Sequence, residues 1–109
     1  MQNLLNKKCI PCEGGTRPLT EEQIAEFLPQ ISKWEVLKNK EIRRTFLFNN
    51  FSEAMDFVNK VGDLAEQEGH HPNIYVHDWN KVTIELSTHA IGGLSENDFI
   101  LAAKIDELQ

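Results

Sequence analysis

The chain has 109 residues, of which 40% are hydrophobic and 26% are charged, as in an ordinary globular domain. Its 11 basic and 17 acidic residues give a formal charge of −6, which disfavours nucleic acid as a partner because such binding depends on neutralised phosphates. No apolar run approaches the ~20 residues needed to cross a bilayer, and residues 1–8 are not followed by the apolar region of a secretory signal. We therefore expect a cytoplasmic protein with no membrane partner.

Residues 1–19 are expected to form an irregular arm that lies on a single domain spanning residues 20–109. Cys9 and Cys12 have the spacing of a redox pair or of half a zinc site. A redox pair would follow a strand and a zinc ribbon would need a second cysteine pair, and the sequence offers neither. We therefore expect two ordinary reduced thiols in the arm.

A short helix and a β-hairpin are predicted over residues 20–48, where regular structure is expected to begin. Thr20 and Gln23 have the spacing of a capping box. Residues 34–37 and 42–48 are rich in aromatic and β-branched side chains and flank a polar turn. Arg44 falls on the buried face of the second strand, so its aliphatic stem is expected to lie at the rim of the core.

The longest predicted helix follows, with Ser52 as its cap. Its apolar side chains repeat at helical spacing from Ala54 to Ala65. Gly69 suits the left-handed residue that ends a helix, and Pro72 prevents the helix from resuming. This segment therefore predicts a helix that stops immediately before two histidines.

A second hairpin and a final helix complete the chain. Residues 74–76 and 82–88 are predicted strands around a turn at 78–81, because apolar and polar residues alternate strictly in the second of them. Ser95, with Asp98 three residues later, is expected to cap a helix that runs to the chain end.

The order α-β-β-α-β-β-α predicts an α+β fold, a four-stranded antiparallel sheet with helices packed on one face. The open edge strands of such a small sheet are usually protected or paired with another subunit. We therefore expect a homo-oligomer held partly through a sheet edge.

Three of the four histidines lie at the ends of predicted elements. His70 and His71 follow the long helix, whose C-terminal partial charge favours an imidazolium, and His89 ends the last strand. If the second hairpin pairs as predicted, the three imidazoles meet at one edge of the sheet. Glu66, four residues before His70, could orient an imidazole or favour its protonation.

This histidine cluster has three interpretations. The side chains could simply lie on the surface. They could hold zinc through three imidazoles and an open position, although adjacent residues of an extended segment point to opposite sides. They could also act as general acids and bases, which requires no metal.

Several motifs surround the histidines. They are Glu66-x-x-x-His70-His71-Pro72, Tyr75, Trp79-Asn80-Lys81-Val82, Leu86-Ser87-Thr88-His89 and Gly93-Leu94-Ser95-x-x-Asp98. This combination resembles the pterin-4a-carbinolamine dehydratase family over roughly residues 20–108, and the Cys-x-x-Cys-Glu-Gly-Gly arm is similar to that of bacterial members. The resemblance implies the same α+β fold and assembly into homodimers or homotetramers.

The resemblance also implies a lyase reaction, the dehydration of 4a-hydroxytetrahydropterin to quinonoid dihydropterin, which recycles a pterin used by an aromatic amino acid hydroxylase. We expect no cofactor and no metal. The family's catalytic positions fall on His70, His71, His89 and Glu66, and its substrate contacts on His70, His71, Pro72, Thr88, His89, Ala90, Ile91 and Asp98. Some members carry an acid immediately before the two histidines, where this chain has Gly69.

Loss of the 4a-hydroxyl needs an acid for the leaving oxygen and a base for the N5 proton. His70 and His89 are expected to transfer these protons, in roles that the sequence leaves open, while His71 mainly binds. Two other functions are alternatives. One is a dimerisation or coactivator module that binds a protein through the same fold, and the other is a pterin scaffold of molybdopterin or folate metabolism.

Overall fold

In the computed structural model, which describes residues 3–11 and 16–109, four antiparallel strands form one sheet in the order β1-β2-β4-β3. The strands are β1 (Glu35–Leu37), β2 (Glu41–Leu47), β3 (Asn73–His77) and β4 (Lys81–Leu86). Each predicted hairpin is present, and β2 pairs with β4 to join the two hairpins. As a result β1 and β3 are the edge strands.

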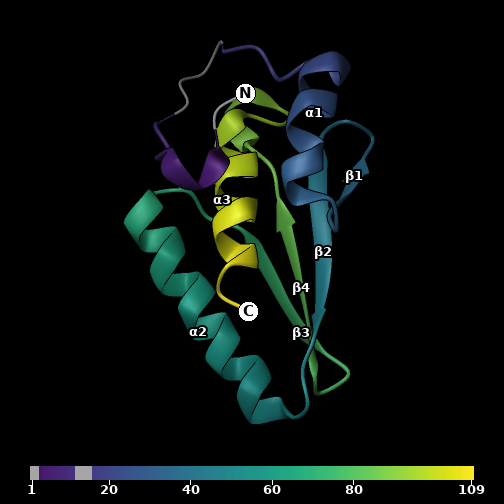
Figure 1. The fold of residues 1–109 in the computed structure, drawn as a ribbon, viewed down its shortest axis with the longest axis vertical. Helices are drawn as coiled ribbons and strands as arrows, with labels where there is room; N and C mark the ends of the chain where they lie inside the picture. Colours follow the sequence, from purple (N-terminus) through teal and green to yellow (C-terminus); the bar gives the residue numbers. More distant parts are fainter. Residues whose placement is uncertain (1–2, 12–15) are drawn as a thin grey trace.

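Three α-helices cover one face of this sheet, and in Figure 1 α3 lies between α1 and α2 with the sheet behind them. The helices are α1 (Glu21–Phe27), α2 (Phe51–Glu68) and α3 (Glu96–Asp106), with the 3₁₀ turns η1 (Leu4–Asn6), η2 (Leu28–Ile31) and η3 (His89–Ile91). The predicted α+β class and the order of its helices and strands are confirmed. No helix in the described part of the chain is long and apolar enough to cross a membrane.

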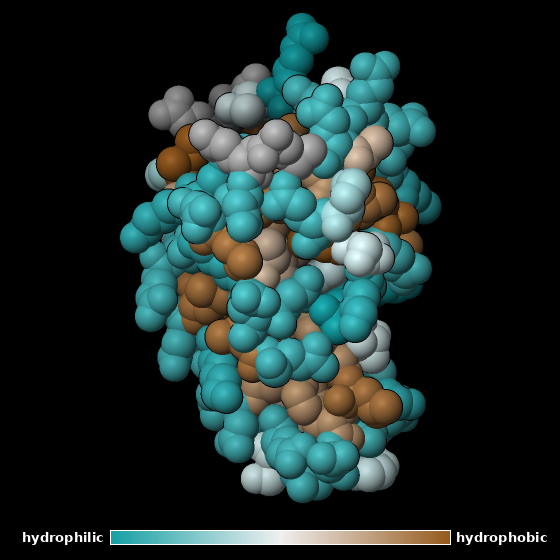
Figure 2. Space-filling model, viewed as in Figure 1, coloured by the Kyte–Doolittle hydropathy of each residue, from teal (hydrophilic) through white to brown (hydrophobic). Residues whose placement is uncertain are grey.

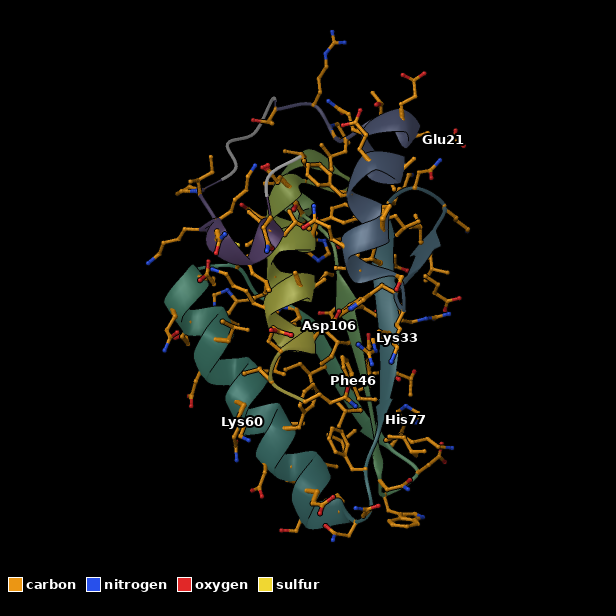
Figure 3. All side chains as sticks on the ribbon, viewed as in Figure 1. Glu21, Lys33, Phe46, Lys60, His77 and Asp106 are labelled. Carbon is orange, nitrogen blue, oxygen red and sulfur yellow. The ribbon has the colours of Figure 1, made fainter. Side chains whose placement is uncertain are left out.

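Alternate residues of the strands face the helices and form the centre of the core. Val82, Ile84 and Leu86 of β4 are buried, as their alternation with polar residues predicted. Arg44 lies on the same face of β2, with its guanidinium 4.2 Å from the centre of the Phe46 ring and 2.6 Å from Asp106. Figure 3 labels Phe46 and Asp106 between the helices and the sheet. The ring and the carboxylate explain how a charged residue occupies this position.

The two ends of α2 show how local sequence sets its length. Asn50, and not Ser52, is the N-cap, since its side chain accepts the Glu53 N–H at 2.8 Å. Asparagine and serine cap helices about equally well, so the sequence pattern did not choose correctly between them. At the other end Gly69 has a φ of 66°, and its N–H donates to the Ala65 carbonyl. The predicted left-handed glycine at the end of the helix is therefore confirmed.

The last helix, α3, is buried on almost all sides, although the sequence predicted a single apolar stripe. Its buried residues run from Asn97 to Ala103 and include Ile105, because the helix is enclosed by its neighbours and the sheet. It ends at Asp106, so the expectation that it runs to the chain end was wrong by a few residues. By contrast, Figure 2 shows mostly hydrophilic side chains over the outer surface of the helical layer.

The N-terminal segment contributes to the core, which the sequence pattern did not reveal. Leu4 on η1 is fully buried, and its N–H donates to the Gln30 side chain at 2.9 Å. Cys9 is also buried. The expectation that regular structure begins at Thr20 was therefore wrong, because a single anchoring leucine has no periodicity that a pattern can detect. Cys12 lies outside the described residues.

Candidate active site

A cavity of about 380 Å³ opens where the end of α2 meets the loop after β4. His70, His71 and His89 all line it, so the structure brings together the three histidines that the sequence grouped. Gly69, Ser87, Thr88 and Ala90 complete this side of the cavity.

The topology explains why segments far apart in the sequence meet here. Gly69 ends α2, so His70 and His71 lie in the turn that leads into β3. Because β3 and β4 are antiparallel neighbours, the start of β3 and the end of β4 share one edge of the sheet. The strand ends at Leu86, and His89 stands on η3 instead of ending the strand as predicted.

His70 is held by a buried carboxylate from α3. Its Nε2 lies 2.5 Å from Oδ1 of Asp98, whose side chain is fully buried. Oδ2 of Asp98 accepts the Thr88 hydroxyl at 2.9 Å and the Ser95 N–H at 3.0 Å. The hydrogen bonds compensate for burial of the carboxylate charge. With its Nε2–H donated to Asp98, His70 keeps Nδ1 for proton transfer.

His71 has a separate and more exposed partner. Its Nε2 lies 2.5 Å from Oε2 of Glu66, and the two side chains are 63% and 77% exposed. Glu66 therefore pairs with the imidazole of His71 and not with that of His70, the residue four positions along the chain. Gly69 leaves the helical conformation, so the four-residue spacing no longer stacks the Glu66 and His70 side chains on one helix face. An exposed pair of this kind contributes orientation more than stability.

His89 is exposed, and none of the residues described in the structure forms a hydrogen bond with its imidazole. Both of its ring nitrogens are therefore available to a ligand in the cavity. His77, the remaining histidine, lies on the opposite end of β3 (Figure 3) and bonds to Thr83 and Asp78.

The other expected site residues divide into three groups. Thr88 and Ala90 line the cavity, whereas Pro72 and Ile91 are neighbours of lining residues without lining it themselves. Asp98 is fully buried and reaches the cavity through His70. Sequence reasoning missed Ile10, Pro11 and Asn97, which also line the cavity, and no motif in the sequence marked them.

Cys9 lies beneath this site in a setting that suppresses its reactivity. Burial, together with the nearby Glu68 carboxylate, raises the pKa of the Cys9 thiol to about 12. The thiolate is therefore scarce near neutral pH, and Cys9 is not a nucleophile. Burial alone would raise the pKa of Glu68, but the Cys9 N–H and the Lys104 ammonium hold it below its usual value. Within residues 3–11 and 16–109, no three His, Cys, Asp or Glu side chains are grouped to hold a metal ion.

Known proteins resemble this chain in sequence and in fold. The sequence profile of the family described as "Pterin 4 alpha carbinolamine dehydratase" matches residues 17–108. A relative from Alkaliphilus metalliredigens, provisionally named a pterin-4-alpha-carbinolamine dehydratase, is 48% identical over 100% of this chain and 98% of its own length. The mitochondrial pterin-4-alpha-carbinolamine dehydratase 2 of Arabidopsis thaliana is 43% identical over 100% of this chain and 60% of its own length.

A solved structure agrees with this relationship. The transcriptional coactivator/pterin dehydratase from Brucella melitensis superposes with a TM-score of 0.77 at 33% identity, over 85% of this chain and 98% of that protein. The profile match, the identities over the whole chain and the shared fold lead to one conclusion. This chain belongs to the pterin-4-alpha-carbinolamine dehydratase family.

Proposed function

We propose that this protein is a lyase that dehydrates 4a-hydroxytetrahydropterin to quinonoid dihydropterin. The proposal rests on one observation. His70, whose Nε2 is bonded to the buried Asp98, lines the same cavity as His89, whose imidazole has no hydrogen-bond partner among the described residues. Two imidazoles at one cavity can supply the acid and the base that the reaction needs. Membership of the family supports the substrate class.

In the reaction the bond between C4a and its hydroxyl oxygen breaks, and the hydroxyl leaves as water after receiving a proton. The N5–H proton goes to a base, and its electron pair forms the C4a=N5 double bond. We assign these transfers to Nδ1 of His70 and to the imidazole of His89, one neutral and one protonated at the start. Each turnover leaves the two imidazoles with exchanged protonation states. Both are then reset, because the base releases its proton to solvent and the acid takes one from solvent, which the exposed His89 reaches directly.

His71 and Glu66 have a supporting role in this proposal. The Glu66 carboxylate orients the His71 imidazole at the mouth of the cavity, where it binds substrate. We assign the amide and amino edge of a pterin to the loop from Thr88 to Ile91, where Ala90 lines the cavity, with Pro72 as an adjacent apolar contact. The Thr88 N–H and carbonyl are already bonded to Gly93 and Ile91 within this loop. Asp98 acts through His70 as a positioning residue.

The assembly and cellular setting are part of the same proposal. A homodimer or homotetramer would form through an edge strand, and β3 exposes Tyr75 and Val76 beside its free edge. A cytoplasmic location, independence of cofactors and metals, and an aromatic amino acid hydroxylase as the supplier of substrate stay predictions.

A protein-binding module is the second candidate function. The similar protein from Brucella melitensis is described as a transcriptional coactivator as well as a pterin dehydratase. In this chain Leu47, Phe51 and Trp79 are exposed near the turn between β3 and β4 and the start of α2, at the end of the molecule opposite the histidines (Figure 1). Exposed apolar side chains of this kind are suited to a protein partner.

The proposed site is tested by titrating the labelled protein with 7,8-dihydropterin and recording the imidazole resonances by NMR. We expect the signals of His70, His71 and His89 to shift with one common saturation curve, while those of His77 stay in place. His77 is the internal control, because its imidazole lies at the far end of β3. Shifts confined to residues around Trp79, or no shift at all, would contradict a pterin site at the histidines.

A further inference from the structure

Part of the cavity lining comes from the N-terminal segment. Ile10 and Pro11 line the same cavity as His70, His71 and His89. Ile10 is 70% exposed, the largest exposed fraction of any large hydrophobic side chain in the described residues. An aliphatic side chain therefore faces open space beside three imidazoles.

The backbone of Ile10 is held in place by a single side chain of α3. Oδ1 of Asn97 accepts the Ile10 N–H at 3.0 Å, and Nδ2 of Asn97 donates to the Ile10 carbonyl at 2.5 Å. Asn97 is buried and Ile10 is exposed, so the two hydrogen bonds join the domain interior to the surface segment. The Asn97 side-chain amide thus bonds to both the N–H and the carbonyl of Ile10, as the backbone of a neighbouring β-strand would.

The preceding residue is fixed by a second, independent anchor. The Cys9 N–H donates to Oε1 of Glu68 at 2.9 Å, and Oε2 of the same carboxylate accepts from Lys104 at 2.8 Å. Glu68 is the last residue of α2 and Lys104 belongs to α3. Two helices therefore determine where the segment lies over the cavity.

Asn97 also links the segment to the histidines. It directly precedes Asp98, whose carboxylate holds His70. The first turn of α3 therefore holds both an imidazole and the Ile10 backbone of the cavity lining.

We propose that Ile10 and Pro11 are the apolar wall of the substrate site, that a flat heteroaromatic ligand packs on them, and that Asn97 is the positioning residue for this wall. The inference rests on the proposed function for the identity of the ligand. A pterin has two apolar ring faces and a polar edge, and the exposed Ile10 side chain gains burial when a ring face covers it.

If the segment had only a structural role, truncating the Ile10 side chain would leave KM unchanged. The two Asn97 hydrogen bonds reach the backbone of Ile10 and not its side chain, so truncating the Ile10 side chain leaves both in place while removing the wall. Leu5 is a matched control, because it is a 37% exposed aliphatic side chain on the same segment and does not line the cavity.

The test compares steady-state dehydration of 4a-hydroxytetrahydropterin by the wild type, Ile10→Ala and Leu5→Ala. For Ile10→Ala we expect KM to rise about 5- to 30-fold, the loss expected for part of one buried aliphatic side chain, with kcat within about twofold of wild type. Ile10→Leu should restore KM, and Leu5→Ala should leave it unchanged. A KM for Ile10→Ala equal to that of Leu5→Ala would overturn the proposed wall.

Asn97→Ala tests the positioning role. We expect KM to rise as for Ile10→Ala, and the Ile10 amide to lose protection from hydrogen exchange while the amides of β4 stay protected. An unchanged KM with a freely exchanging Ile10 amide would overturn the role of Asn97.

The proposed function is judged separately, on the wild type alone. If the wild type binds 7,8-dihydropterin without turnover, the dehydratase reaction is wrong, and the same variants are then compared by their Kd for that ligand. A wild type that neither binds nor reacts would overturn the pterin assignment and the ligand proposed for the wall.

Discussion

Replacing His70 or His89 with alanine is expected to lower kcat for dehydration by about 10²–10⁴, the usual contribution of a positioned acid or base. Each substitution removes one of the two imidazoles that we assign to proton transfer. Far-ultraviolet circular dichroism should show that both variants stay folded. His89 is exposed, whereas His70→Ala is expected to lower stability because it removes one partner of the buried Asp98 carboxylate, which keeps the Thr88 hydroxyl and the Ser95 N–H. The rates are measured with chemically generated 4a-hydroxytetrahydropterin and corrected for its spontaneous dehydration.

His77→Ala is the control for these two variants. Its imidazole lies 2.7 Å from the Thr83 hydroxyl on the other end of the hairpin, far along β3 from the cavity. We expect a rate within about twofold of wild type, since no proton transfer is assigned to this residue. If His77→Ala were as damaging as His89→Ala in two folded proteins, the assignment of the site would be wrong.

Asp98→Asn is expected to lower kcat by about 10²–10⁴ while the protein stays folded. The substitution keeps the shape of the side chain but changes which ring nitrogen of His70 carries the hydrogen. The amide has one oxygen for the Ser95 N–H and the Thr88 hydroxyl, so its NH₂ group would face Nε2 of His70. Nε2 would then accept, and the ring hydrogen would move to Nδ1, the atom that we assign to proton transfer.

Asp98→Ala should in addition destabilise the fold by about 3–5 kcal/mol, since it removes one partner of a buried charged network. Urea unfolding monitored by tryptophan fluorescence measures this loss. Glu66→Gln is the matched control, because the Glu66–His71 pair is exposed, and we expect little change in stability. Full activity in a folded Asp98→Asn variant would contradict the positioning role of Asp98.

Much of the fold could be predicted because its signals are local. The alternation of Val82, Ile84 and Leu86 marks a half-buried strand, and Gly69 marks the end of a helix wherever that helix packs. Since antiparallel hairpins join neighbouring ends, these signals also bring His70 and His89 to one edge. The grouping of the histidines therefore followed from topology.

The partners of the histidines could not be predicted in the same way. Spacing placed Glu66 within reach of an imidazole without showing which one, and the left-handed conformation of Gly69 breaks the helical spacing between Glu66 and His70. The actual partner, Asp98, is 28 residues away in the sequence and meets His70 only through packing of α3. Local patterns do not encode such a contact.

The contribution of the N-terminal segment to the core and to the cavity could not be predicted for a related reason. Leu4 and Ile10 are isolated apolar residues without a period of 2 or 3.6, so the segment was expected to be irregular. Its position depends on single side chains of α2 and α3, such as Glu68 and Asn97. These contacts could be recognised only once the helices were in place.

The most direct test of the account is single-turnover dehydration of 4a-hydroxytetrahydropterin by the purified wild-type protein in a stopped-flow spectrometer. The account predicts that quinonoid dihydropterin forms faster than in buffer alone, in proportion to protein concentration, and that the His70→Ala/His89→Ala double variant loses this acceleration. A wild-type protein that leaves the spontaneous rate unchanged at saturating concentration would contradict catalysis by the histidine cavity.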